Sequence, residues 1–182
     1  MKTLLVGLMM ISSAFAAEID VASSSLKWTG KKVTGEHFGK IAFSKGNLDI
    51  KDGKIMAGEF TVDMTTIGCD DLEGEWKDKL VGHLKNDDFF SVDKFKTSTL
   101  KIKSATQAKG DIFNVVADLT IKDKTHPVKF DMTKKDGKFA GKLVFDRTKY
   151  DIKYGSGKFF ADLGDKMIND EVALDFTVAV KN

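Results

Sequence analysis

Hydrophobic and polar residues alternate with a period of two over most of the chain after about residue 25. In the segment 111–122, for example, Phe113, Val115 and Leu119 share one side and polar residues fill most positions between them. Such alternation is typical of β-strands that have one buried and one solvated face, as in antiparallel sheets. The pattern therefore indicates an all-β protein, with strands near residues 25–32, 38–44, 46–51, 54–64, 94–103, 111–122, 127–135, 138–147 and 170–181.

Turn signals separate these segments. Asp52-Gly53 and Asp136-Gly137 are hairpin dipeptides, because both central residues of that tight turn need a positive φ. Pro127 stands at the start of its strand, where a missing amide donor is tolerated. The segments 38–44 and 46–51 are interpreted as one bulged strand, which leaves about eight strands. Eight long strands in sequence order favour a closed antiparallel up-and-down barrel over an open sheet.

One segment breaks the alternation. Leucine or tryptophan recurs every four residues within residues 70–86, which predicts one short inserted helix with Asp70 or Asp71 as its N-cap. A second irregular region, 149–169, carries a Gly-Ser-Gly loop. Residues 70–86 are therefore the one helix predicted in an otherwise all-β domain.

The pattern leaves the inside of the barrel undecided. An eight-stranded barrel has room for side chains or for one small ligand. The inward face is rich in Phe and Met, with Gly58 and Gly141 beside bulky neighbours, so a narrow apolar channel and a filled core are both compatible with it. A barrel in water is favoured over an outer-membrane barrel, since the chain has only two Trp and two Tyr to form aromatic girdles.

The first 16 residues do not belong to this pattern. Lys2 precedes an apolar stretch from Leu4 to Ile11, and Ala14-Phe15-Ala16 supplies small residues at a cleavage site. These features predict a secretory signal peptide over residues 1–16 and a barrel domain over residues 17–182. Eight apolar residues are too few for a membrane anchor, since a spanning helix needs about 20. The expected localisation is the periplasm.

The composition excludes several classes of protein and indicates no catalytic or metal-binding chemistry. With Lys2 removed, 28 basic and 27 acidic residues remain, so no strong basic field marks a nucleic-acid binder. Cys69 is the only cysteine and can form no internal disulfide. His37, His83 and His126 lack the spacing of metal ligands on one element, and no catalytic motif is present. We therefore expect no enzyme, no metal and no cofactor.

Arg147 is the only arginine in a chain with 28 lysines. Arginine offers a planar fork of five donors that lysine cannot replace. Three interpretations stay open: chance, a packed arginine that ties the last loop to the barrel, and a contact with the polar end of a ligand.

Four segments carry a family resemblance. Residues 28–50 are similar to a Trp-x-Gly-Lys…Gly-x-His-x-Gly opening. Residues 58–67 and 83–100 resemble a His-Leu-x-x-x-Asp-Phe-Phe segment, residues 118–132 a Leu-Thr-Ile-x-Gly-x-Thr-x-Pro-Val segment, and residues 145–181 the arginine and last strand. Together they resemble the YceI-like family of periplasmic, lipocalin-like lipid-binding proteins. Asp123 and Asp151 stand where that family usually has glycine.

The resemblance implies an elongated eight-stranded barrel around an internal tunnel. Its implied function is to sequester or carry a polyisoprenoid or other long amphipathic lipid, without nucleic acid and with a homodimer as one possible assembly. His37, His83 and Arg147 are candidates for the polar end or for structural roles. The tail is expected to contact the inward residues Met56, Phe60, Val62, Phe113, Val115, Leu119, Phe130, Met132, Phe145, Leu174 and Phe176. A ligand-free structural barrel and an enzyme on a quinone-like lipid are the alternatives.

Overall fold

The computed structural model of the chain describes residues 15–181. This part holds nine strands, one α-helix and three short 3₁₀ helices. The strands are β1 (Phe15–Lys32), β2 (Gly35–Lys40), β3 (Ala42–Lys51), β4 (Lys54–Asp63), β5 (Thr97–Lys109), β6 (Ile112–Ile121), β7 (Lys124–Lys135), β8 (Lys138–Asp146) and β9 (Ile168–Val180). The helices are α1 (Gly74–Lys85), η1 (Met64–Thr66), η2 (Arg147–Tyr150) and η3 (Gly164–Lys166).

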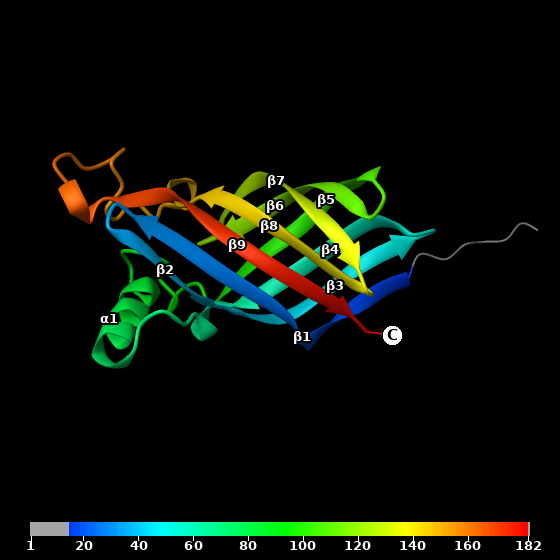
Figure 1. Cartoon of the computed structure of the whole chain (residues 1–182), viewed down its shortest axis with the longest axis horizontal. Coiled ribbons are helices and arrows are strands. Elements are labelled where there is room, and N and C mark those ends of the chain that lie inside the picture. Colours follow the sequence, from blue (N-terminus) through cyan, green and yellow to red (C-terminus); the bar gives the residue numbers. More distant parts are fainter. Residues whose placement is uncertain (1–14, 182) are drawn as a thin grey trace, which may run out of the picture.

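The strands close into a barrel in which every neighbouring pair is antiparallel (Figure 1). From β3 to β9 each strand pairs with the next one in sequence, and β9 pairs with β1. β2 and β3 both pair with β1, β2 along Lys27–Lys32 and β3 along Phe15–Glu18. β2 and β3 therefore form one interrupted strand, so the barrel has eight strand positions. The break lies at Ile41 and not at residue 45 as predicted, although the β3–β4 register does shift between Phe43 and Lys45.

The alternation that predicted the strands also places the core. On β6, the inward residues Phe113, Val115, Ala117, Leu119 and Ile121 are at most 5% exposed. β1 is longer than predicted. Residues 21–24 bulge out of the ladder between Asp20 and Ser25, and this bulge interrupts the alternation that would have indicated the first half of the strand. The strand boundaries elsewhere differ from prediction by a few residues.

The turns explain the two departures from the family pattern. Asp123 and Asp151 adopt φ values of 57° and 61°, in the left-handed region that usually calls for glycine. Aspartate tolerates this conformation better than most residues. The two loops therefore keep a glycine-type backbone without glycine.

Met56 is oriented opposite to prediction. In the β3–β4 ladder, Asp49 pairs with Ala57 and Ile50 with Ile55, so Met56 is an extra residue on β4. This β-bulge shifts the phase of the strand by one residue. Ile55 points inward at 3% exposure and Met56 points outward at 53%.

The predicted helix is present but shorter. α1 begins after Glu73, which is its N-cap, and neither Asp70 nor Asp71 caps it. Its stripe is only partly buried: Leu84 is buried, whereas Trp76 is 71% exposed. The helix thus lies on the barrel by its last turns, and its first turns face solvent.

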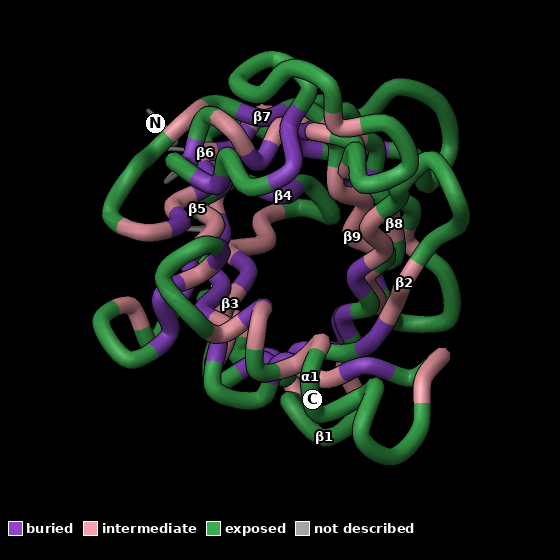
Figure 2. The backbone as a smooth tube through the Cα atoms, turned by 90° about the vertical axis from the view of Figure 1, so that its left-hand side faces the viewer, coloured by how far each residue is buried: buried purple, intermediate pink, exposed green. Residues whose placement is uncertain are grey.

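The two ends of the barrel differ. One end carries the short β3–β4, β5–β6 and β7–β8 turns (right in Figure 1). The other carries the long segment with α1 between β4 and β5 and the loop between β8 and β9 (left in Figure 1). In Figure 2, viewed from this second end, the strands form a closed ring with α1 at its lower edge. We call these the closed end and the open end.

The predicted signal peptide lies outside the described residues except for Phe15 and Ala16, so it stays a prediction. Across residues 15–181, no helix has the length and hydropathy that a membrane-spanning helix requires.

Candidate functional site

A cavity of about 200 Å³ lies inside the barrel and extends to the open end. Its wall positions on β9 run from Ile168 to Val178. Ten residues of strand span about 33 Å, which corresponds to about 25 Å along the axis of a barrel with the usual tilt. The wall is apolar over most of this length, so the cavity has the shape and lining of a tunnel for an apolar chain.

The closed end of the barrel is filled. Its inward side chains pack together at no more than 3% exposure and do not line the cavity; they are Ile19, Leu48, Ile55, Phe113 and Phe139. The glycines predicted to leave room do not leave it empty. A Cβ on Gly58 would lie 2.8 Å from Leu48, and one on Gly141 would lie 2.7 Å from the Phe176 ring. These glycines admit neighbouring side chains into the barrel.

The structure sorts the predicted tail-contact residues into three groups. Phe113 and Val115 point inward but do not line the cavity, and Met56 lies on the outer surface. The other eight line the cavity, and their contact with a ligand stays a prediction: Phe60, Val62, Leu119, Phe130, Met132, Phe145, Leu174 and Phe176. The sequence reasoning missed further wall residues whose alternation was visible, among them Leu26, Trp28, Ile41, Phe43 and Leu143.

Polar lining residues gather at the open end. Lys31, Lys32 and His37 come from the β1–β2 hairpin, and Asn169 is the second residue of β9. Arg147 lies where β8 ends. The cavity therefore has an apolar interior and a polar mouth, which is the arrangement that an amphipathic chain requires.

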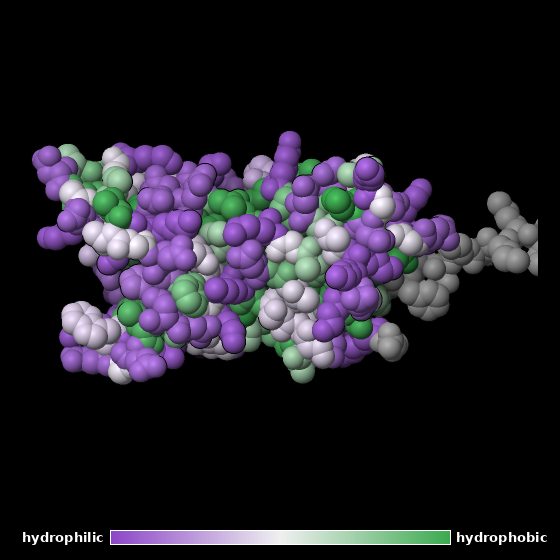
Figure 3. Space-filling view, in the orientation of Figure 1, coloured by the Kyte–Doolittle hydropathy of each residue, from purple (hydrophilic) through white to green (hydrophobic). Residues whose placement is uncertain are grey.

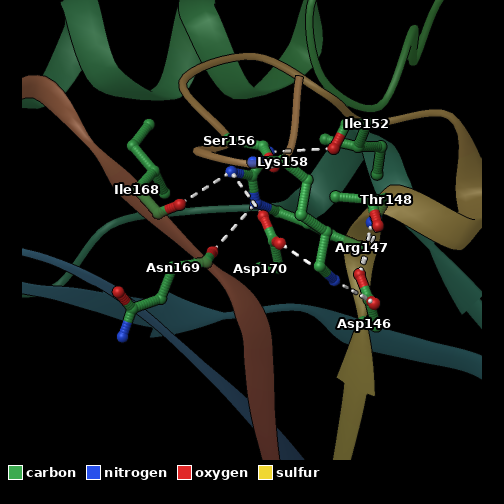
Figure 4. A network of polar contacts seen from close by, with 9 residues as sticks. All are labelled: Asp146, Arg147, Thr148, Ile152, Ser156, Lys158, Ile168, Asn169 and Asp170. Carbon is green, nitrogen blue, oxygen red and sulfur yellow. Dashed lines mark hydrogen bonds and ion pairs between the residues drawn. The ribbon is translucent and has the colours of Figure 1, made fainter. Parts of the chain in front are cut away.

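Arg147 is 2% exposed and acts as a tie between backbone segments (Figure 4). Its Nε and two terminal nitrogens donate to the carbonyls of Asn169, Ile152 and Ile168 at 3.0, 2.8 and 3.0 Å. Burial lowers the pKa of the guanidinium, and the charges of Asp170, 3.6 Å away, and Asp146 act in the opposite direction. This geometry supports the second interpretation of Arg147, a packed arginine that fixes both ends of the β8–β9 loop.

Asp146 extends this network to the loop. It accepts hydrogen bonds from the amide and hydroxyl of Thr148 at 2.9 and 2.6 Å, and Lys158 Nζ lies 2.9 Å away. Burial raises the pKa of this carboxyl, but the bonds to Thr148 and Lys158 outweigh burial and lower it. Lys158 also contacts Asp170 at 3.0 Å, so one lysine bridges the strand end and the strand start.

A second polar cluster holds the other side of the mouth. Asp71 accepts from the amide of Phe38 at 2.8 Å and lies 2.7 Å from Nδ1 of His37, and the Cys69 thiol donates to it at 3.3 Å. Burial raises the pKa of Asp71, and these three bonds together lower it. His37 is thereby oriented at the cavity wall. No sequence signal paired Asp71 with His37, because the two lie 34 residues apart.

Cys69 serves packing in this cluster. It is completely buried, and burial together with the hydrogen bond to Asp71 raises the pKa of its thiol. A thiol held protonated inside the protein is a poor nucleophile.

Packing of the backbone explains why residue 39, in the first family segment, is a glycine. A Cβ on Gly39 would collide with the Gly68 carbonyl, because the backbone of residues 68–70 pairs directly with β2. The Trp28 indole also donates to that carbonyl, at 2.8 Å. Gly39 thus allows the chain segment that carries Asp71 to lie against β2.

The other two histidines do not line the cavity. His83 on α1 packs edge-on against Phe89 and Tyr154, with ring centroids 4.8 and 4.6 Å apart. His126 contacts the Lys149 carbonyl at 2.9 Å. Within residues 15–181, no three His, Cys, Asp or Glu side chains form a group able to hold a metal ion.

The YceI-like domain family model matches residues 18–180. The chain belongs to the YceI-like domain family. The match covers the whole barrel, from the first half of β1 to the end of β9, so the family assignment applies to the cavity and to both polar clusters at its mouth. A comparison with curated proteins gave no significant match.

Solved structures share the YceI-like fold with this chain. BcnA from Burkholderia cenocepacia is 22% identical, with a TM-score of 0.71 and coverage of 90% of this chain and 99% of that one. A polyisoprenoid-binding domain from Saccharophagus degradans, implicated in plant cell wall breakdown, is 14% identical, with a TM-score of 0.64 and coverage of 90% and 97%. A Campylobacter jejuni YceI protein is 15% identical, with a TM-score of 0.57 and coverage of 99% and 92%.

Proposed function

We propose that this protein is a periplasmic binding protein that sequesters or carries a polyisoprenoid or another long amphipathic lipid in its internal tunnel. In this proposal, residues 1–16 direct export and are removed. The binding of polyisoprenoids by a neighbour of the same fold is in keeping with this ligand class.

The observation that carries the proposal is the contrast along the cavity. An apolar tunnel runs inside the barrel to a mouth with Lys31, Lys32 and His37. The apolar tail would lie inside. The polar head would stay at the mouth, where water and charged side chains supply the hydrogen bonds that it would lose inside the tunnel. Each buried methylene contributes about 0.8 kcal/mol, so a long tail needs few polar contacts to bind.

The two alternatives fit the molecule less well. A ligand-free structural barrel does not need an apolar cavity, since interiors normally pack without voids of this size. An enzyme acting on a quinone-like lipid needs a reactive group at the cavity. Among the described residues, the arginine at the mouth is engaged with backbone carbonyls, and Cys69 is buried.

The test uses adjacent residues on β8 that face opposite sides of the wall. Leu143 lines the cavity at 2% exposure, and Val144 is 44% exposed outside. Protein purified from the periplasm of its own host is analysed by native mass spectrometry and by solvent extraction. We expect a lipid adduct in the wild type and in Val144→Trp, and its loss or shortening in Leu143→Trp.

If Leu143→Trp fails to fold, Leu100→Trp serves instead, because Leu100 also lines the cavity and is only partly buried. A wild-type protein without any adduct or extractable lipid contradicts the proposal. Equal lipid content in the inward and outward variants contradicts the tunnel as its location.

A further inference from the structure

Exposed apolar side chains gather at the open end. The described residues include ten large hydrophobic side chains that are exposed, and six of them lie in the connections around the mouth. The remaining four are spread over the closed end and the outer wall. The six are Val33, Trp76, Tyr154, Phe159, Phe160 and Met167.

The most exposed aromatic rings lie on two projections that flank the mouth. Trp76 on α1 is 71% exposed, and Phe159 and Phe160 in the β8–β9 loop are 50% and 49% exposed. Both projections extend beyond the barrel at the same end (Figure 1), and the space-filling view is indented between them (Figure 3). We call Trp76, Phe159 and Phe160 the aromatic rim.

Lysines accompany these rings. Lys79 Nζ lies 5.1 Å from the Trp76 ring centroid, and Lys153 Nζ lies 5.2 Å from that of Phe159. Aromatic rings with flanking cations are characteristic of the membrane interface, where rings enter the headgroup region and long cationic side chains reach the phosphates.

The net charge of this end limits the kind of contact. The segments 31–36, 64–96, 122–126 and 146–171 hold 14 basic and 16 acidic residues. No positive field is therefore available to attract an anionic surface. Contact with a membrane would depend on apolar insertion and would be almost independent of salt.

We propose that the open end docks on the interfacial region of a phospholipid bilayer through the aromatic rim. The inference rests on the proposed function, since a tail that moves between bilayer and tunnel would otherwise cross water. The mouth lies between the two projections, so their insertion brings it against the headgroups. Docking through this end is transient, because only a few rings enter the membrane.

The experiment uses zwitterionic phosphatidylcholine vesicles and the full barrel chain after export. Trp76 and Trp28 are the only tryptophans, and Trp28 is buried at 6% exposure. Vesicles that contain brominated phosphatidylcholine should quench the wild-type emission. The quenching should be largely absent in Trp76→Phe; any quenching left in that variant reports entry of lipid to Trp28 in the cavity.

A matched pair of double variants isolates the rim. Phe159→Ser with Phe160→Ser should weaken vesicle binding at least about tenfold, because two half-exposed rings no longer leave water. Ile112→Ser with Val144→Ser removes comparable exposed apolar groups away from the mouth and should leave binding unchanged. Raising salt from about 0.05 to about 0.5 M should change binding less than about twofold.

The possible failures are distinguishable. Absent vesicle binding, equal losses in both double variants, or strong salt dependence would overturn the docking proposal while lipid adducts in the wild type still support the carrier function. Concentration-dependent self-association by analytical ultracentrifugation, abolished by the rim variant in the absence of vesicle binding, would assign the rim to a second copy of the chain. A wild type with no lipid adduct would remove the proposed function itself.

Discussion

At the closed end of the barrel, the side chains of Leu48, Phe113 and Phe139 are at most 2% exposed, and tight turns join the strands. Along the cavity wall, residues such as Phe130 and Leu174 are only partly buried, and at the open end long connections replace the turns. The same barrel strands thus form a packed core at one end and line a cavity over the rest of their length.

The difference shows how a barrel keeps an internal space without collapsing. The closed end supplies hydrophobic stabilisation by dense packing. The open end cannot pack its interior, and two polar clusters fix its backbone instead: Arg147 with the β8–β9 carbonyls, and Asp71 with His37, Phe38 and Cys69. Stability and ligand capacity are therefore separated along the barrel axis.

The largest expected effect tests the packing half of this comparison. Phe139→Ala at the closed end should lower the free energy of unfolding by about 3–5 kcal/mol, because it leaves a cavity in dense packing. Phe130→Ala at the cavity wall should cost only about 1–2 kcal/mol, because its ring already borders open space. Denaturant unfolding of both variants, stripped of lipid, measures the difference. Equal losses would mean that the two halves are packed alike.

Arg147 tests the polar half. Arg147→Met should destabilise by about 3 kcal/mol, because it leaves buried carbonyls without donors and Asp170 with Lys158 as its remaining cationic partner. Arg147→Lys should recover little of this, since an ammonium cannot reach three carbonyls in a plane. Unfolding measurements and limited proteolysis of the β8–β9 loop provide the readouts. A stable Arg147→Lys protein that has lost lipid binding would instead support a ligand-contact role.

Asp71 gives a smaller, pH-dependent effect. Its pKa in the folded protein is below the ordinary 3.8, so its charged form stabilises the fold above that pH, and the contribution is lost as pH falls through the folded pKa. Asp71→Asn should therefore cost about 1–2 kcal/mol at pH 7 and progressively less below pH 3.8. Thermal unfolding of wild type and variant from pH 7 to pH 2.5 follows this difference. A difference that stays constant over the range would contradict the role of the Asp71 charge.

The sequence predicted the parts of the fold that depend on local pattern. The alternation on β6, the single broken strand formed by β2 and β3, and the inserted helix were all readable, since each depends on neighbours in the chain. Eight cavity residues were predicted for the same reason. Met56 was wrong because the bulge adds one residue between Ile55 and Ala57, so counting back from Phe60 assigns the inward orientation to Met56 instead of Ile55, and no residue type marks that bulge.

The alternation of hydrophobic and polar residues could not predict contacts between segments that are distant in the sequence. Nothing in the spacing of the residues pairs Asp71 with His37. Nor does the alternation show that Phe113 packs in the filled end whereas Leu119, six residues further along β6, lines the cavity. The glycines misled in a similar way, because the room that Gly141 leaves is occupied by Phe176 from the neighbouring strand. Such outcomes depend on three-dimensional packing, which a single sequence does not encode locally.

The length dependence of lipid binding tests the central claim most directly. Polyprenyl alcohols of increasing length are titrated into lipid-free protein, with calorimetry or displacement of a fluorescent lipid as the readout. The account predicts that affinity rises with each added isoprene unit, by about 0.8 kcal/mol per buried methylene at most, until the extended tail reaches about 25 Å and then stops rising. An affinity independent of chain length, or no binding at any length, would contradict a lipid tunnel in this barrel.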